Sequence, residues 1–192
     1  MSTNKNMREA KKAKKDEFYT KISDIENEVG YYWDCLKDIV VYCPCDDYRW
    51  SNFTKYFKRE FHNIGLKKLI CTNYDLGDGA FKYIYDGNTE TIEKLKGNGD
   101  FESQEIIDII NNEADVIISN PPFSKWRNFM KLVVNKKYLV IGNLNAATYK
   151  EIFPYIKNGE MWLGNTEPKE FIMPNSYPLL GNSYTVDENE DI

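Results

Sequence analysis

The chain has only one histidine, His62, and no apolar stretch long enough to span a bilayer. The longest apolar runs, such as residues 38–43, are far shorter than the roughly 20 residues that a membrane helix needs. His62 lies in the aromatic stretch predicted as a helix, so we expect it to have a structural or surface role and see no Ser/His/Asp constellation for nucleophilic catalysis. The N-terminus lacks the apolar segment of a signal peptide, which favours a cytoplasmic location and no membrane partner.

Cysteine is also scarce, and its spacing suits neither a metal site nor a disulfide framework. The four cysteines are Cys35, Cys43, Cys45 and Cys71. They follow no zinc-type spacing, and Cys43 and Cys45 are too close for an easy disulfide. We therefore expect no metal and a reducing compartment.

Length and charge describe a small acidic protein with a basic beginning. The 192 residues suit one compact domain, and the net charge is −5. Residues 1–21 hold seven lysines and arginines against three acids, so the net charge of residues 22–192 is −9. The basic segment can contact phosphate, although the simpler interpretation is a solvated, frayed helix. The acidic remainder is a poor electrostatic match for DNA.

The apolar pattern predicts strands that alternate with helices. Continuous apolar runs typical of buried strands lie at 38–43, 68–72, 115–119 and 138–142. Apolar residues at helical spacing predict helices over 16–37, 52–62, 103–111, 124–135 and 146–157. Residues 81–85 alternate like a hairpin strand, and the tail adds apolar segments at 161–163 and 171–173. The sequence thus predicts an α/β protein with a Rossmann-like, doubly wound, mostly parallel sheet, whose ligands bind at the carboxyl ends of its strands.

The strongest chemical signal is Asn120-Pro121-Pro122-Phe123, which directly follows the third buried run. The Asn120 carboxamide oxygen and a proline carbonyl can each accept one hydrogen of an amino group on a flat base. Two such acceptors stabilise the positive charge that develops on this nitrogen when it attacks. Phe123 offers a face on which an extruded base can stack. The alternative interpretation is a strand-ending turn with a buried phenylalanine.

The same tetrapeptide is the catalytic motif of amino-group methyltransferases that use S-adenosylmethionine, and the chain resembles the EcoRI-type adenine-specific DNA methyltransferases in particular. The resemblance runs collinearly through residues 16–20, 24–28, 40–47, 51–53, 55–57, 65–70, 99–101, 119–123, 148–151 and 162–164. It implies a methyltransferase-type Rossmann-like fold and assigns catalysis to the four motif residues, Asn120, Pro121, Pro122 and Phe123.

The resemblance also implies cofactor-binding residues by position. Phe18, Tyr19 and Thr20 match the upstream motif that closes over the methionine part of the cofactor. Asp100 matches the acid that accepts the amino group of the cofactor's adenine, and Phe101 the ring that packs on it. Solvated loop positions are the alternative for these acids.

A second cofactor segment is implied after the first strand, where Cys43, Cys45, Asp46 and Asp47 stand. The two aspartates are expected to receive the cofactor's ammonium. This loop has no glycine, whereas most methyltransferases have a glycine-rich turn there. The acid expected after the second strand is open between Asn73, Tyr74 and Asp75.

By resemblance the expected activity is S-adenosylmethionine-dependent N6-adenine methylation of DNA in a restriction–modification setting, by direct transfer to a flipped-out base. Expected domains are a basic arm (1–15), a catalytic domain (16–182) and an acidic tail (183–192). Family members are longer, so we expect either a truncated member or a second chain that supplies target recognition. Two alternatives stay open: a degenerate module that binds cofactor or a partner without catalysis, and an amino-group methyltransferase acting on RNA or protein.

Overall fold

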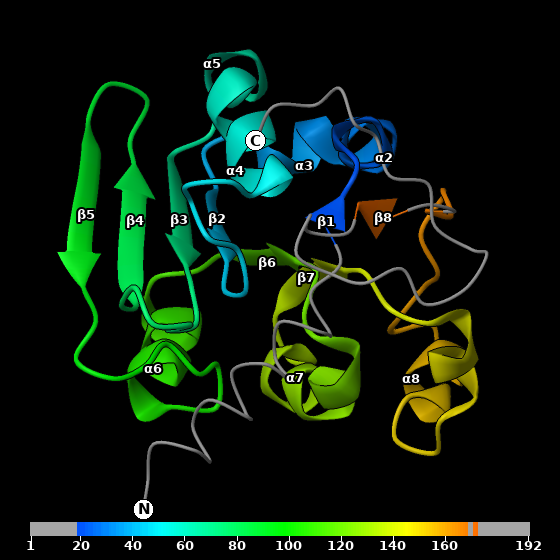
Figure 1. Cartoon of the computed structure of the whole chain (residues 1–192). Helices are drawn as coiled ribbons and strands as arrows, with labels where there is room; N and C mark the ends of the chain where they lie inside the picture. Colours follow the sequence, from blue (N-terminus) through cyan, green and yellow to red (C-terminus); the bar gives the residue numbers. More distant parts are fainter. Residues whose placement is uncertain (1–18, 169–170, 173–192) are drawn as a thin grey trace, which may run out of the picture.

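The computed structural model describes residues 19–168 and 171–172, and its centre is a six-stranded sheet with helices on both faces (Figure 1). The strand order is β5-β4-β3-β2-β6-β7. The strands are β2 (Val40–Cys43), β3 (Lys68–Thr72), β4 (Phe81–Tyr85), β5 (Glu90–Lys94), β6 (Val116–Ser119) and β7 (Lys137–Val140). The expected α/β fold is confirmed.

The four strands predicted from continuous apolar runs lie side by side and parallel. β2 pairs with β3 on one side and with β6 on the other, and β6 pairs with β7. β2 and β6 are buried along their whole length, as strands covered on both faces must be. The antiparallel hairpin β4–β5 extends the sheet beyond β3, so the sheet is mixed.

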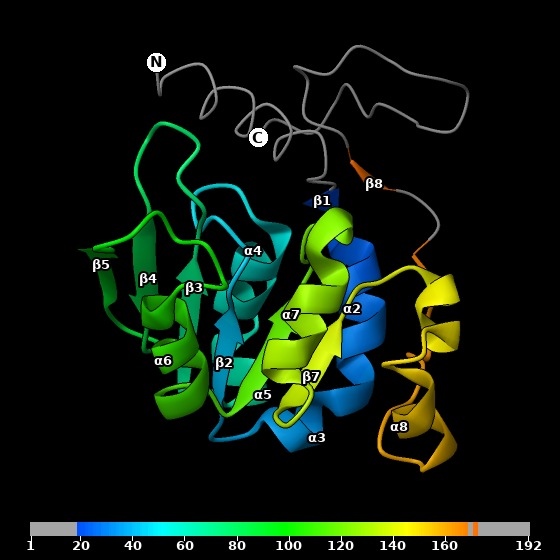
Figure 2. The same cartoon turned by 90° about the horizontal axis from the view of Figure 1, so that it is seen from below.

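Alternate residues of the central strands supply two separate cores. Val41 and Cys43 face the helices drawn above the sheet in Figure 1, whereas Val40 and Tyr42 face those below it. The first set is α2 (Ile22–Val29), α3 (Trp33–Leu36), α4 (Asn52–Arg59) and α5 (Phe61–Ile64). The second set is α6 (Gln104–Asn112), α7 (Trp126–Val133) and α8 (Phe153–Lys157), of which α8 lies beyond β7 in Figure 2. None of the helices described is long and apolar enough to traverse a bilayer.

The connections place a topological switch beside β2. From β2 the chain proceeds to β3 on one side, and after the hairpin and α6 it returns to β6 on the other. Because β2 and β6 are parallel, their carboxyl ends diverge into loops at the same edge of the sheet. Ligands of open α/β sheets bind at such a point.

Four predicted helices differ in extent from those in the structure. Within 16–37, residues Tyr19–Thr20 form a strand, β1, that pairs with β8 (Phe171–Ile172), and α2 begins only at Ile22. A 3₁₀ turn at Gly30–Tyr32 then separates α2 from α3; residues 16–18 lie outside the described part.

Within 146–157, a 3₁₀ turn (Leu144–Thr148) precedes α8, which begins at Phe153 because Pro154 is tolerated only in a first turn. The helix predicted over 52–62 is interrupted at Glu60, and that over 124–135 starts with a 3₁₀ turn at Phe123–Lys125. Residues 161–163 form no strand.

Candidate functional site

The loop formed by residues 120–123 leaves the carboxyl end of β6 at the switch point. Pro122 has φ −54° and ψ 127°, and a 3₁₀ turn begins at Phe123. The Asn120 side chain donates from Nδ2 to Thr20 Oγ1 at 3.3 Å. This hydrogen bond joins the 120–123 loop to β1. The structure thus brings together Asn120 and Thr20, which the sequence analysis placed in different motifs.

Asp46 ties the loop after β2 to the end of β6. Its Oδ2 accepts a hydrogen bond from Ser119 Oγ at 3.1 Å, and its Oδ1 accepts one from Ser51 Oγ at 2.8 Å. Ser51 is also the N-cap of α4, accepting from the backbone N–H of Phe53 and Thr54. Asp46 is therefore bonded to the residue that directly precedes Asn120.

The Asp46 carboxyl is only 7% exposed, and this burial raises its pKa to about 7. The two serine hydroxyls favour the ionised form and the charge of Asp47 opposes it, but burial outweighs both. Asp46 accordingly changes its charge near neutral pH, so a cation nearby can favour its ionised state.

Asp47 lies beside Asp46 but already has a cationic partner. Its carboxylate accepts hydrogen bonds from Arg49 Nε at 2.9 Å and from a terminal guanidinium nitrogen at 2.7 Å. The guanidinium carbon of Arg49 lies 4.4 Å from the centroid of the Trp50 ring. An ammonium group that approached Asp47 would compete with this pair.

The two cysteines of the same loop lie in different surroundings. The Cys43 side chain is fully buried among the residues beneath α2 and α4, and burial raises the pKa of its thiol. Cys45 is half-buried and packs against the opposite core. Of the two side chains, that of Cys45 alone reaches the protein surface.

The turn formed by residues 97–101 is pressed against the end of β3. Gly99 has φ +72°, and a Cβ at this position would lie 1.9 Å from the carbonyl oxygen of Asn73, so glycine is required. Asp100 Oδ1 accepts from the backbone N–H of Glu102 at 3.1 Å, and Oδ2 accepts from Lys125 Nζ at 2.9 Å. Phe101 is 4% exposed and packs edge to face on Phe129 at 5.3 Å. Only a small part of the Phe101 ring is thus available to a ligand.

Asn73 and Asp75, which follow β3, form hydrogen bonds within their own loop. Asn73 donates from Nδ2 to the carbonyl of Gly79 and accepts at Oδ1 from the backbone N–H of Phe81. Asp75 accepts from the backbone N–H groups of Gly77 and Gly79, and these hydrogen bonds lower its pKa. Both the nitrogen and the oxygen of the Asn73 amide are thus hydrogen-bonded to backbone groups of the same loop.

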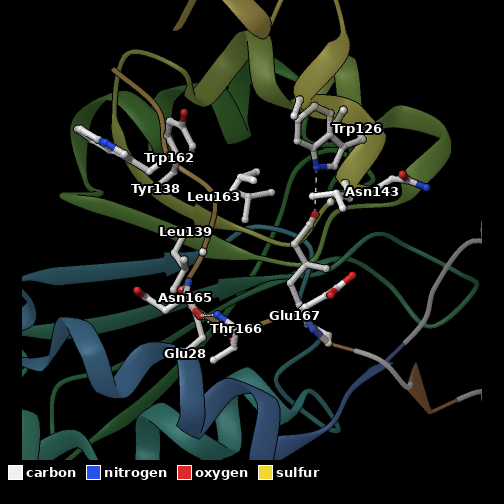
Figure 3. A pocket seen from close by; sticks show the side chains of 18 of the residues that line it. Glu28, Trp126, Tyr138, Leu139, Asn143, Trp162, Leu163, Asn165, Thr166 and Glu167 are labelled. Atoms are coloured by element: carbon white, nitrogen blue, oxygen red, sulfur yellow. Dashed lines mark hydrogen bonds between the residues drawn. The ribbon is translucent and has the colours of Figure 1, made fainter. Parts of the chain in front are cut away.

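A cavity of about 730 Å³ lies along β7 (Figure 3). Thr20, Asp24 and Phe123 line it together with β7, α7, α8 and residues 161–168. Glu28 holds this last segment, because its carboxylate accepts from the backbone N–H groups of Asn165 at 2.9 Å and Thr166 at 2.6 Å. The indole N–H of Trp126 lies on the other side and donates to Ile141 O.

Several of these residues were not identified individually from the sequence. Ser51, Ser119, Glu28 and Lys125 act through contacts with residues far away in the chain, so no local spacing marks them. Phe18 lies outside the described residues. The described part contains no group of three or more metal-ligating side chains.

The family model described as "Adenine-specific methyltransferase EcoRI" matches residues 6–191. The chain is 41% identical to Type II methyltransferase M.EcoRI of Escherichia coli over 211 residues, covering 98% of this chain and 64% of that protein. It is also 41% identical to Type II methyltransferase M.MgeORF184P of Mycoplasma genitalium, covering 88% of this chain and 55% of the relative. Type II methyltransferase M.MpnI of Mycoplasma pneumoniae is 38% identical over 82% of this chain and 50% of its own length. The chain thus spans between half and two thirds of these relatives' lengths, and no solved structure matches it significantly.

Proposed function

Because the chain belongs to the EcoRI-type family of adenine-specific methyltransferases, we propose that it transfers a methyl group from S-adenosylmethionine to N6 of an adenine in DNA. Two hydrogen bonds at the switch point carry this proposal. Ser119 donates to Asp46, and the neighbouring Asn120 donates to Thr20. There the segments expected to bind the cofactor and the base are joined by direct hydrogen bonds.

The residues present fit the cofactor. S-adenosylmethionine is a cation with an ammonium group and an adenine amino group, and it supplies an electrophilic methyl carbon. Asp46 and Asp100 stand on loops at one edge of the sheet, and carboxylates are suitable acceptors for both amino groups. Asp46, whose pKa burial raises to about 7, can ionise beside a cation and so lessen the cost of burying that cation. The strand order around β2 supports a Rossmann-like fold of the methyltransferase type.

The 120–123 loop then serves the target base. The Asn120 oxygen and a proline carbonyl accept the two hydrogens of the N6 amino group, which directs the nitrogen lone pair at the methyl carbon. As the nitrogen gains positive charge, these two acceptors stabilise it. Phe123 stacks on the base, which has to leave the duplex to be reached.

Target recognition is a separate part of the proposal. The relatives are longer than this chain, and residues 22–192 carry a net charge of −9, which opposes a polyanion. We propose that the contacts that select the target sequence lie outside residues 22–192, in a segment like the unmatched part of the relatives or in a second polypeptide.

The test is a transfer assay with labelled S-adenosylmethionine on DNA, RNA and protein, beside calorimetric titration of the cofactor. We expect cofactor binding, and label in DNA adenine once the unmatched portion of M.EcoRI is supplied as a second chain. Label in RNA or protein would replace the proposed substrate. Cofactor binding without any transfer would reduce the chain to a binding module, and no binding would overturn the proposal.

A further inference from the structure

Lys125 connects the two loops that the proposed reaction uses. It ends the 3₁₀ turn that begins at Phe123, and its side chain reaches across to the 97–101 turn. The ammonium lies 2.9 Å from Asp100 Oδ2, 3.7 Å from Glu102 Oε2 and 5.4 Å from the centroid of the Phe101 ring. One side chain thus contacts both residues expected to hold the cofactor's adenine.

These contacts fix the orientation of the Asp100 carboxylate. Lys125 binds one oxygen, and the backbone N–H of Glu102 binds the other. Partial burial disfavours the charge of the ammonium, but its hydrogen bond and its attraction to Asp100, together with Glu102, raise the pKa of Lys125. The Lys125 ammonium therefore keeps its charge at neutral pH, and the Asp100 carboxylate has further lone pairs for an amino group.

We propose that Lys125 is a positioning residue that holds Asp100 in its adenine-accepting orientation and couples the cofactor site to the 120–123 loop. The inference rests on the proposed function, since it needs a cofactor adenine at Asp100. Lys125 acts through Asp100 and touches neither of the reacting atoms.

The ion pair is not what keeps the turn in place. Phe101 packs on Phe129 in the core, and Gly99 packs tightly against Asn73, so the turn has apolar and backbone anchors of its own. The Lys125 side chain is 42% exposed, so its replacement creates no buried cavity. We therefore expect Lys125→Gln to fold and to change the site alone. Lys131→Gln removes the same charge from an exposed position of α7 and is the matched control.

The first measurement is the dissociation constant of S-adenosylmethionine and of S-adenosylhomocysteine, by calorimetry. Both ligands contain the adenine, but only the first contains the sulfonium charge. If Asp100 loses its orientation, the dissociation constants of both ligands rise alike. From the strength of a charge-assisted hydrogen bond, we expect this rise to be about 5- to 30-fold. Simple removal of a positive charge instead strengthens binding of the cationic ligand alone. We expect equal weakening with Lys125→Gln, rescue by Lys125→Arg, and no change with Lys131→Gln.

The second measurement is a double-mutant cycle with Asp100→Asn. If Lys125 acts through Asp100, the double variant binds no more weakly than Asp100→Asn alone. Independent, multiplying losses would overturn the inference, as would wild-type affinity of Lys125→Gln or strengthened binding of the cationic ligand alone. Absence of cofactor binding by the unmodified chain would instead refute the proposed function, so the two failures are distinguishable.

Discussion

Replacement of Asp46 by asparagine is predicted to change how the stability of the protein depends on pH. Burial raises the pKa of Asp46 from 3.8 to about 7. Between about pH 4 and pH 7 the folded chain therefore keeps a proton on Asp46 that the unfolded chain has lost. Because the folded state binds more protons in this window, the free energy of unfolding falls as the pH rises through it, and the loss is complete above pH 7.

The magnitude follows from the size of the shift. One pKa unit corresponds to about 1.4 kcal/mol, and about two units of the interval from pH 5 to pH 8 lie below the folded pKa. The contribution of Asp46 to the free energy of unfolding thus falls by roughly 3 kcal/mol from pH 5 to pH 8. Asp46→Asn cannot titrate, and its amide can hydrogen-bond to the hydroxyls of Ser51 and Ser119.

The assay is denaturant unfolding of both proteins at pH 5, 6, 7 and 8. The unfolding free energy of the wild type minus that of Asp46→Asn should fall by about 3 kcal/mol from the lowest to the highest pH. Asp34→Asn, at an exposed position, should follow the wild type at every pH. Parallel curves for the wild type and Asp46→Asn would refute the reasoning, because the carboxyl would then have an ordinary pKa in the folded chain.

Three further predictions concern the base, the cavity and DNA. Phe123→Ala should slow methyl transfer while leaving the cofactor dissociation constant unchanged, and equal losses in both would remove Phe123 from the base site. The backbone N–H groups of Asn165 and Thr166 donate to the Glu28 carboxylate, so Glu28→Ala should raise their hydrogen-exchange rates by the equivalent of about 1–3 kcal/mol. Unchanged exchange rates would show that Glu28 does not hold this segment. Any DNA affinity of the isolated chain should be weak and insensitive to sequence, with a log–log salt slope near −3.6 for about four phosphate contacts, and should vanish when residues 1–15 are deleted. Tight, sequence-specific binding would contradict this last expectation.

The central part of the fold could be predicted because local patterns determine it. Residues 39–43, 69–71 and 116–118 are apolar throughout, and strands covered on both faces have this pattern. Ser103 was expected at the start of a helix, and its hydroxyl accepts from the backbone N–H of Ile106. The apolar run at 115–119 also predicted that Asn120 lies at the carboxyl end of a strand.

The incorrect helix boundaries arise where a distant partner or a single residue overrides periodicity. Residues 19–20 pair with residues 171–172, so apolar spacing around them could not reveal a strand. Apolar spacing predicts one continuous helix over 146–157, but Pro154 has to lie in a first turn, so α8 begins only at Phe153.

Most of the site residues found from their sequence motifs lie in loops and turns, but the contacts that join these segments were not predictable. Asp46 and Ser119 are 73 residues apart, and Asp100 and Lys125 are 25 apart. Such pairs depend on the order of strands in the sheet, which no local spacing encodes.

The most direct test of the account compares turnover with cofactor affinity in Asn120→Ala, with Asn135→Ala at an exposed position after α7 as the matched control. Methyl transfer to DNA adenine is measured in the presence of the second chain, and the dissociation constant of S-adenosylmethionine is measured on the same samples. The account predicts that transfer falls about 10²–10³-fold while the dissociation constant stays at the wild-type value, because the carboxamide oxygen acts on the amino group of the base. Full transfer activity in Asn120→Ala, or a loss of cofactor affinity as large as the loss of rate, would contradict it.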